Sequence, residues 1–367
     1  MGLNDLFLNN HALKTNPILS SRLLALCSRI IETDESLVAD NQARTLIRSV
    51  VSACKAVFET NQMGPIVFCT PELGRWSTVG GLGVMVDELS LGLAELGQEV
   101  IVISPYYDRN RKGVTGYLSK DPAGFEYIDN ITVTADVKIT LGVHEGTVGG
   151  VKLAFLHHAE IFPQPYPDQT AANAVRQLAV YGKACLEYLC KRQVIPSVCV
   201  TNDWFTGFIP GYAKTGQFGP TFKGTTFMHI CHNLQESYEG RIFPEPRDGG
   251  LEYIHGLPRD ILINPEWSSV CINPSRCAIM MSDNWSTVSN SYKEDLLNSS
   301  PLSPLLCLKE SPFAHPNGIP IAERIRKLDE RAPDHMAAKK ALQMKYFNYG
   351  DLDDSVPLFA FVGRITQ

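Results

Sequence analysis

A glycine-rich loop is the first segment of the chain whose residue types suggest chemistry. It follows a short apolar run at residues 66–69 and carries Gly74, Gly80, Gly81 and Gly83. Glycines let a backbone approach a ligand closely, and the helical pattern that begins at Leu82 would point free N–H groups at the loop. An anion such as a diphosphate is stabilised at such a position by about 0.3–1 kcal/mol. We therefore expect the loop to contact phosphate, the alternative being that its glycines only form a turn.

The same loop lacks the two common nucleotide-binding signatures. A dinucleotide fingerprint would need a third glycine after Gly81 and Gly83, where the chain has Val86. A P-loop would need Gly-Lys followed by Ser or Thr, which does not occur here. The loop therefore does not indicate a nicotinamide-dependent or ATP-dependent enzyme.

Polar side chains follow three further predicted strands. The strand at 197–200 leads into Asp203-Trp204, the strand at 225–231 leads into His232-Asn233, and the strand at 151–158 is followed by Glu160. Ligands of open α/β sheets gather at the carboxyl ends of strands. A carboxylate there can accept charge-assisted hydrogen bonds from the hydroxyl groups of a ligand, and a neighbouring tryptophan offers a surface to an apolar face of that ligand. The structural alternatives are that Asp203 caps the next helix and that Trp204 lies in the core.

The elements that must position these residues alternate between strand and helix patterns. Strands are predicted at 66–69, 99–103, near 131–141, and at 151–158, 197–200, 225–231 and 285–290; helices are predicted at 82–96, 171–191, 274–281, 292–297 and 334–346. This order predicts an α/β fold with a Rossmann-like parallel sheet and flanking helices. Residues 1–62 show helical periodicity and predict an α-helical N-terminal extension, which either packs on the main domain or docks a partner. Residues 243–273 are rich in turn residues and predict surface loops.

Composition narrows the choice of partners and compartment. The net charge of −6 and the lack of a long basic run argue against nucleic acid and anionic membranes. No apolar stretch approaches the roughly 20 residues of a membrane span, and the N-terminus lacks a secretory signal pattern. Ten cysteines without a C-x-x-C pair are typical of a reducing compartment, so we expect a cytoplasmic protein. Cys185 and Cys190, on one predicted helix, are an alternative metal-binding pair.

These motifs together resemble the bacterial and plant glycogen and starch synthases of glycosyltransferase family five. The resemblance rests on Glu72, Gly80-Gly81-Leu82, Pro105-Tyr106-Tyr107, Asp203-Trp204, His232-Asn233, Phe243-Pro244, Pro316-Asn317-Gly318 and the strand pattern at 356–364. It covers residues 64–367 and differs from the family pattern at four positions. Thr78 stands where the family has a lysine, and Asn202 and Phe205 replace the histidines beside Asp203-Trp204. Pro320 stands where the family usually has an acidic residue.

The resemblance implies the N-terminal half of a GT-B glycosyltransferase. It predicts a catalytic N-terminal domain at 63–320, then a linker and the first strand of a C-terminal domain at 321–367. The implied reaction moves glucose from ADP-glucose or UDP-glucose to the non-reducing end of an α-glucan with retention of configuration. No metal or cofactor is implied, since cationic side chains take the role of magnesium; the donor base and the oligomeric state stay open.

The resemblance also assigns roles to individual residues. His232, Asp203 and Arg364 are the implied catalytic residues, with His232 on the 6-hydroxyl side of the donor glucose and Arg364 on the diphosphate. The implied substrate-binding residues are Gly80, Gly81, Leu82, Asn233, Trp204, Glu72 and Glu160. Because the lysine that would partner Arg364 on the diphosphate lies beyond Gln367, we expect the chain alone to have no meaningful turnover.

Two alternatives remain at this point. The departures at Thr78, Asn202 and Phe205, together with the end of the family match at Gln367, also fit a non-catalytic glucan-binding or regulatory relative. Another retaining GT-B sugar transferase would share the same fold. If the chain is an enzyme, Arg75 is a candidate to replace the missing lysine near the phosphate.

Overall fold

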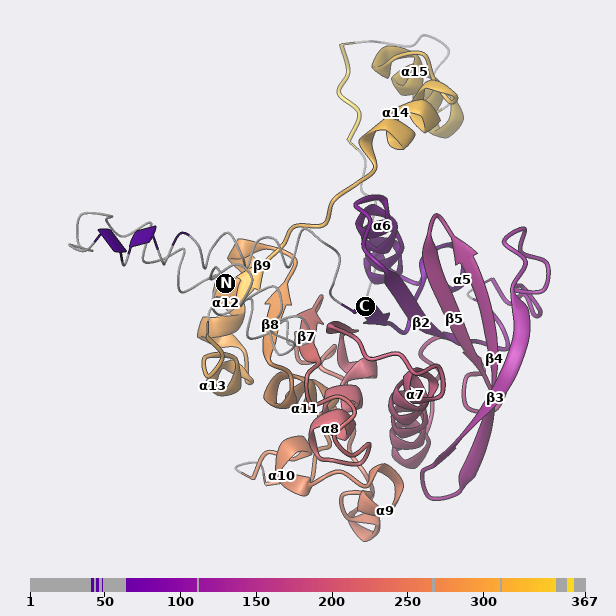
Figure 1. Ribbon diagram of the computed structural model, residues 1–367. Helices are drawn as coiled ribbons and strands as arrows, with labels where there is room; N and C mark the ends of the chain where they lie inside the picture. The colour runs from indigo at the N-terminus through magenta and orange to yellow at the C-terminus, as the bar shows by residue number, and fades with distance from the viewer. Residues whose placement is uncertain are drawn as a thin grey trace. The chain divides into compact units, whose positions relative to one another are not determined.

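The computed structural model describes residues 41–42, 44–45, 48, 64–110, 112–265, 268–310, 312–347 and 355–359 (Figure 1). The chain divides into two compact units, residues 1–317 and residues 318–367, and each is described by itself. Most of the predicted N-terminal extension lies outside the described residues; positions 41, 42, 44, 45 and 48 are helical. Arg364, the residue expected to bind the diphosphate, also lies outside the described residues.

A nine-stranded sheet organises the first unit, in the order β3-β4-β5-β2-β1-β6-β7-β8-β9. The strands are β1 (Ile66–Cys69), β2 (Val100–Tyr106), β3 (Glu126–Thr134), β4 (Lys138–Val148), β5 (Val151–His157), β6 (Val198–Asn202), β7 (Thr226–Cys231), β8 (Asn284–Thr287) and β9 (Phe313–Ala314). From β5 to β9 all neighbouring strands pair in parallel, whereas β3, β4 and β5 pair antiparallel. The predicted α/β class with a Rossmann-like parallel sheet is confirmed.

Helices cover both faces of this sheet (Figure 1). On one face, α6 (Gly81–Glu95) packs against alternate residues of the central strands, including Phe68, Val102 and Val200. On the other, α7 (Ala171–Lys191) and α8 (Phe208–Lys214) pack against Val67, Cys199 and their neighbours. Because parallel strands are buried on both faces, β2 is an unbroken buried run, as its Val-Ile-Val-Ile sequence requires.

Shorter elements complete the first unit. They are α5 (Gly74–Ser77), η2 (Trp204–Thr206), η3 (Pro246–Asp248), α9 (Glu252–His255), α10 (Arg259–Leu262), α11 (Pro274–Met281), α12 (Asn290–Ser299) and α13 (Ser303–Leu306). The caps follow the sequence: the side chain of Thr170 accepts from the N–H of Asn173 at the start of α7, and Asn273 does the same for Arg276 at the start of α11.

Three predicted elements differ from the structure. The strand expected near 131–141 is two antiparallel strands, β3 and β4, that turn at 135–137. The strand expected at 285–290 ends at Thr287, because Ser289 caps α12 through the N–H of Tyr292. The strand expected at 356–364 is not seen in its described part, residues 356–359, which are irregular.

The second unit contains two helices among its described residues, α14 (Ile321–Asp329) and α15 (His335–Phe347). The second matches the helix predicted at 334–346. In the part of the chain that is described, no helix combines the length and the apolar character that a membrane crossing needs.

The strand order creates a switch point beside β1. The chain runs outward from β1 through β2 on one side, and after β5 it returns to place β6 on the other side of β1. Loops that leave the carboxyl ends of two such strands diverge and leave a crevice between them. The loop after β1 holds Glu72 and the glycines, and the loops after β6 and β7 hold Asp203 and His232.

Candidate functional site

A buried carboxylate holds the glycine loop in shape. Glu72 is only 4% exposed, and its Oε2 accepts hydrogen bonds from the backbone N–H groups of Val79 (2.7 Å) and Gly80 (2.9 Å). Its Oε1 accepts a hydrogen bond from the hydroxyl of Tyr166 at 2.8 Å. Glu72 therefore fixes the turn leading into α6, with both of its carboxylate oxygens accepting hydrogen bonds inside the protein.

The first turn of α6 is open beyond this point. Gly80 and Gly81 are exposed, and a Cβ added at either would meet no atom within 4 Å. Gly83 is different, since an added Cβ would lie 2.4 Å from the Thr78 hydroxyl. The side chain of Leu82 is buried in the core under α6, so only its backbone can serve the predicted substrate contact.

Asp203 joins the ends of β6 and β7. Its Oδ1 accepts hydrogen bonds from the backbone N–H of His232 at 2.7 Å and of Asn233 at 3.4 Å, so one carboxylate orders the loop that carries two other predicted site residues. Burial raises the pKa of Asp203 to about 7; these two N–H groups oppose the rise and the nearby Glu72 charge adds to it. The structure thus brings Asp203, His232 and Asn233 together as predicted.

The backbone of Asp203 is strained. Its φ of 52° and ψ of −177° belong to a region that glycine adopts freely and other residues rarely occupy. The predicted alternative, that the Asp203 side chain caps the following helical turn, is wrong, since η2 has no side-chain cap. Such strain costs on the order of 1–3 kcal/mol and is concentrated at functional sites.

His232 is half-buried at the end of β7 and is held through its ring. Its Nε2 lies 3.1 Å from Oδ1 of Asn202, and the Asn202 amide Nδ2 donates to the carbonyl of Cys69 at 3.0 Å. Burial lowers the pKa of His232 to about 4, and the nearby His315 lowers it further. His232 is therefore neutral at pH 7.

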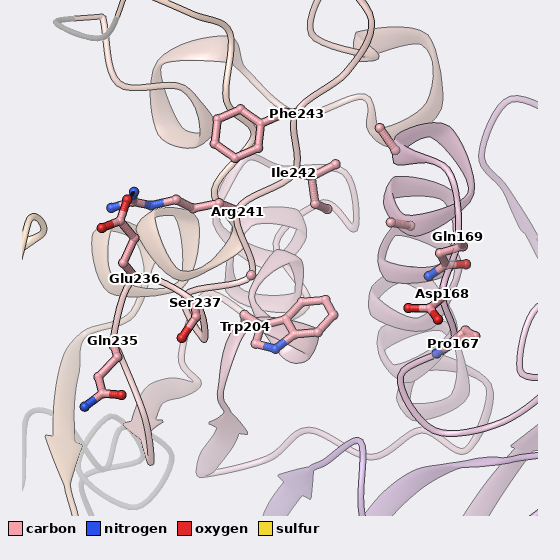
Figure 2. Close-up of a pocket in the computed structure, with 13 residues that line it drawn as sticks. Pro167, Asp168, Gln169, Trp204, Gln235, Glu236, Ser237, Arg241, Ile242 and Phe243 are labelled. Atoms are coloured by element: carbon pink, nitrogen blue, oxygen red, sulfur yellow. Dashed lines mark hydrogen bonds and ion pairs between the residues drawn. The ribbon is translucent and has the colours of Figure 1, made fainter. Parts of the chain in front are cut away.

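Trp204 connects this centre to a pocket of about 1000 Å³ (Figure 2). Its ring lies 6.0 Å from that of Tyr166 and lines the pocket floor between two segments, the loop 167–169 that precedes α7 and the loop 235–243. The lining residues are Pro167, Asp168, Gln169, Ala171, Ala174, Trp204, Gln235, Glu236, Ser237, Gly240, Arg241, Ile242 and Phe243. Trp204 is half-buried and lines this pocket, so it is not wholly a core residue.

One wall of the pocket rests on a buried ion pair. Glu239 is fully buried; its Oε2 accepts from Nε of Arg241 at 2.7 Å and from the amide of Asn273 at 3.0 Å. Arg241 also contacts Glu236 at the pocket rim (Figure 2). Gly240, between them, has a φ of +74°, and a Cβ there would lie 2.4 Å from the Trp204 ring. This wall therefore fixes the position of the tryptophan.

One predicted residue lies apart from this centre. Glu160 is exposed in the turn after β5, two strands away from β1, and has no hydrogen-bond partner among the described residues. Arg75 lies in α5, within the glycine loop, where it forms a two-pronged ion pair with Asp121 (2.9 and 3.1 Å) and stacks over Trp76. In the described part of the chain, no group of three or more His, Cys, Asp or Glu side chains is placed to hold a metal ion. Cys185 and Cys190 therefore belong to no such group.

Sequence reasoning missed Tyr166, Glu239 and Arg241. Tyr166 contacts Glu72 across 94 positions of sequence, and it sits in a Pro-Tyr-Pro segment that predicts only an irregular loop. Glu239 and Arg241 stand in the segment compared with the family motif, but no pattern in the chain indicates that the carboxylate is buried.

The comparisons with known proteins agree with this arrangement. The family model for the starch synthase catalytic domain matches residues 65–306. Glycogen synthase of Treponema denticola is 26% identical over 82% of this chain and 62% of its own length, and glycogen synthase 2 of Geobacter sulfurreducens is 24% identical over 82% and 63%. Starch synthase 1 of Arabidopsis thaliana is 26% identical over 82% of this chain and 50% of its own length. This chain thus spans less than two thirds of the length of these relatives.

A solved structure, the catalytic domain of starch synthase IV from Arabidopsis thaliana bound to ADP and acarbose, shares the fold. It aligns with a TM-score of 0.61 at 23% identity, covering 71% of this chain and 53% of the other. The family model spans well over half of the 367 residues and includes the strand ends that carry Glu72, Asp203 and His232. The chain belongs to the starch synthase catalytic domain family.

Proposed function

We propose that this chain is the acceptor-side domain of a retaining α-1,4-glucan synthase, which transfers glucose from a nucleotide-glucose to the non-reducing end of a glucan. The observation that carries the proposal is the convergence of three strand ends. The glycine loop held by Glu72, the Asp203 carboxylate and the His232 ring all follow strands that are neighbours at the switch point. A sugar joined to a diphosphate needs such a combination of exposed backbone N–H groups and hydroxyl partners.

The pocket beside this centre suits a glucan. Glucose rings offer apolar faces and hydroxyl edges, and the pocket combines Trp204 and Phe243 with polar side chains such as Asp168, Gln169 and Ser237. The floor of the pocket is Trp204, the residue directly after Asp203, so a chain lying in the pocket would point its end at the reacting centre. We propose that the pocket receives the acceptor.

We propose that the phosphates of the nucleotide-glucose donor bind at the exposed turn before α6. Gly80 and Gly81 leave room for phosphate oxygens next to a helix N-terminus, and His232 stands near by as a neutral hydrogen-bonding group. The solved relative is described as bound to ADP and acarbose, which supports a nucleoside diphosphate and an α-glucan as ligands. Arg364, proposed to meet the diphosphate, lies outside the described residues.

Two assays test the proposal. Maltoheptaose should bind this chain, and Trp204→Ala should weaken binding by about 10-fold or more, as expected for loss of a ~1–3 kcal/mol stacking contact. An active polypeptide that contains this chain should incorporate labelled glucose from ADP-glucose or UDP-glucose into glycogen, and His232→Ala should abolish incorporation. The proposal would be contradicted if Trp204→Ala bound maltoheptaose as tightly as the original chain, or if His232→Ala transferred glucose at the original rate.

A non-catalytic glucan-binding relative is the second candidate. It is favoured by Thr78 in the place of the family lysine and by Asn202 and Phe205 in the places of the histidines. In that case a polypeptide that contains this chain would bind maltoheptaose through Trp204 and would incorporate no glucose from either donor. A different retaining GT-B transferase would instead use another nucleotide sugar.

We propose the cytoplasm as the site of this reaction. All eight described cysteines are unpaired, including Cys69, Cys185 and Cys199, which lie in one buried core. Free thiols in contact within a core fit a reducing compartment.

A further inference from the structure

Asn202 occupies a fully buried position between the end of β1 and the ring of His232. Its Nδ2 donates to the backbone carbonyl of Cys69 at 3.0 Å, and its Oδ1 lies 3.1 Å from Nε2 of His232. A backbone carbonyl can only accept a hydrogen bond, so the amide nitrogen of Asn202 must lie on the Cys69 side. The oxygen is then the atom that faces the histidine.

This orientation of the Asn202 amide determines which ring nitrogen of His232 carries the proton. An amide oxygen can only accept, so Nε2 of His232 must carry the proton and donate it. A neutral imidazole carries one proton, and Nδ1 is then a bare lone pair. Nδ1 has no hydrogen-bond partner among the described residues. The groups around the ring keep it neutral: the nearby His315 is half-buried with its pKa lowered by burial, and Asp203 directs its Oδ1 to the backbone N–H of His232.

We propose that Asn202 is a positioning residue for His232, which fixes the Nε2–H tautomer and so makes Nδ1 an acceptor for a donor group of a ligand. The tautomer follows from the two hydrogen bonds of the Asn202 amide alone. A ligand hydroxyl can donate to the lone pair on Nδ1, whereas a carboxylate has no proton to donate and would place its charge against that lone pair.

The tautomer is tested on the chain itself by long-range ¹H–¹⁵N correlation of ¹⁵N-histidine. His232 should show a protonated, pyrrole-type Nε2 and a pyridine-type Nδ1 at pH 7, assigned by the signals that disappear in His232→Gln. His255 is an internal reference for the same tautomer, since its Nε2 faces the carbonyl of Gly250 and its Nδ1 accepts from the N–H of Leu257. A pyrrole-type Nδ1 at His232 would overturn the proposal without any variant of Asn202.

Two variants test whether Asn202 is the cause. Asn202→Leu removes the acceptor, so the Nε2–H proton of His232 should be lost to exchange with water while the His255 signals stay in place. Asn202→Asp keeps an oxygen opposite Nε2 and should retain the Nε2–H signal. An unchanged His232 spectrum in Asn202→Leu would show that another group fixes the ring, and loss of the signal in Asn202→Asp would show that the effect is only structural.

Discussion

Replacing Asp203 by asparagine should make the protein more stable at high pH. The rise of the Asp203 pKa from the usual 3.8 to about 7 is caused first by burial of the carboxylate, against which the two backbone N–H groups of His232 and Asn233 act. A rise of about three pH units corresponds to ~4 kcal/mol. Because the side chain is only half-buried, water screens part of this cost, and we expect ~2 kcal/mol.

The sign of the effect follows from proton linkage. The native state holds the Asp203 proton more tightly than the unfolded chain, so its contribution to stability is fully present below about pH 4 and is lost as the pH rises through about 7. Asparagine keeps an oxygen that can accept hydrogen bonds from both N–H groups, and its amide does not ionise as the pH rises. The stability gain of the variant over the original protein should therefore grow as the pH rises from 4.5 to 8.5.

The assay is thermal unfolding followed by circular dichroism from pH 4.5 to 8.5. A gain of ~2 kcal/mol corresponds to a melting-temperature rise of roughly 4–8 °C for a unit of this size. Asp121→Asn is the control: burial opposes ionisation there, but hydrogen bonds led by that of Arg75 leave the Asp121 pKa lowered, so the stability that this carboxylate contributes is fully present above about pH 4 and the variant should be less stable by a constant amount from pH 4.5 to 8.5. A melting difference for Asp203→Asn that does not vary with pH would refute the reasoning.

Three further predictions follow from contacts in the site. Because Asp203 has a positive φ, Asp203→Gly should be more stable than Asp203→Ala by ~1 kcal/mol in urea unfolding; equal midpoints would remove the claim of backbone strain. Glu72→Leu removes the acceptor of all three contacts, and should cost ~1–3 kcal/mol and speed hydrogen exchange at the N–H groups of Val79 and Gly80; unchanged exchange would contradict its role in holding the glycine loop. Gly240→Ala places a Cβ against Trp204 and should weaken maltoheptaose binding about as much as Trp204→Ala does, whereas Gly92→Ala, whose Cβ meets open space on α6, should bind normally; equal binding by both glycine variants would show that the loop wall does not position the tryptophan.

The sequence was sufficient for the elements that periodicity defines. Buried parallel strands such as β1, β2 and β7 appear as apolar runs, and α7 repeats apolar residues along its length, so each was predicted close to its observed bounds. The β3–β4 hairpin was not resolved as two strands, since Thr and Val of high strand propensity continue on both sides of its turn. The residue types at that edge of the sheet do not indicate that β3 and β4 pair antiparallel.

The site was only partly accessible to sequence reasoning. Polar residues directly after strands identified Asp203 and His232, because strand ends of a parallel sheet share one edge. The inward role of Glu72 was not foreseen, since its partner Tyr166 comes from a distant loop, and the positive φ of Asp203 cannot be read from an aspartate. Leu82 illustrates the limit of a motif, because a motif residue can serve the core with its side chain and leave only its backbone to a ligand.

The central claim is that the ends of β1, β6 and β7 form one sugar and phosphate site. A crystal structure of an active polypeptide containing this chain, soaked with maltoheptaose and a nucleotide-glucose, tests it most directly. We predict a glucan across Trp204 whose non-reducing end lies beside Asp203, with the donor glucose on Nδ1 of His232 and phosphate at Gly80 and Gly81. Donor density on any other surface, with His232 free of contacts, would contradict the account.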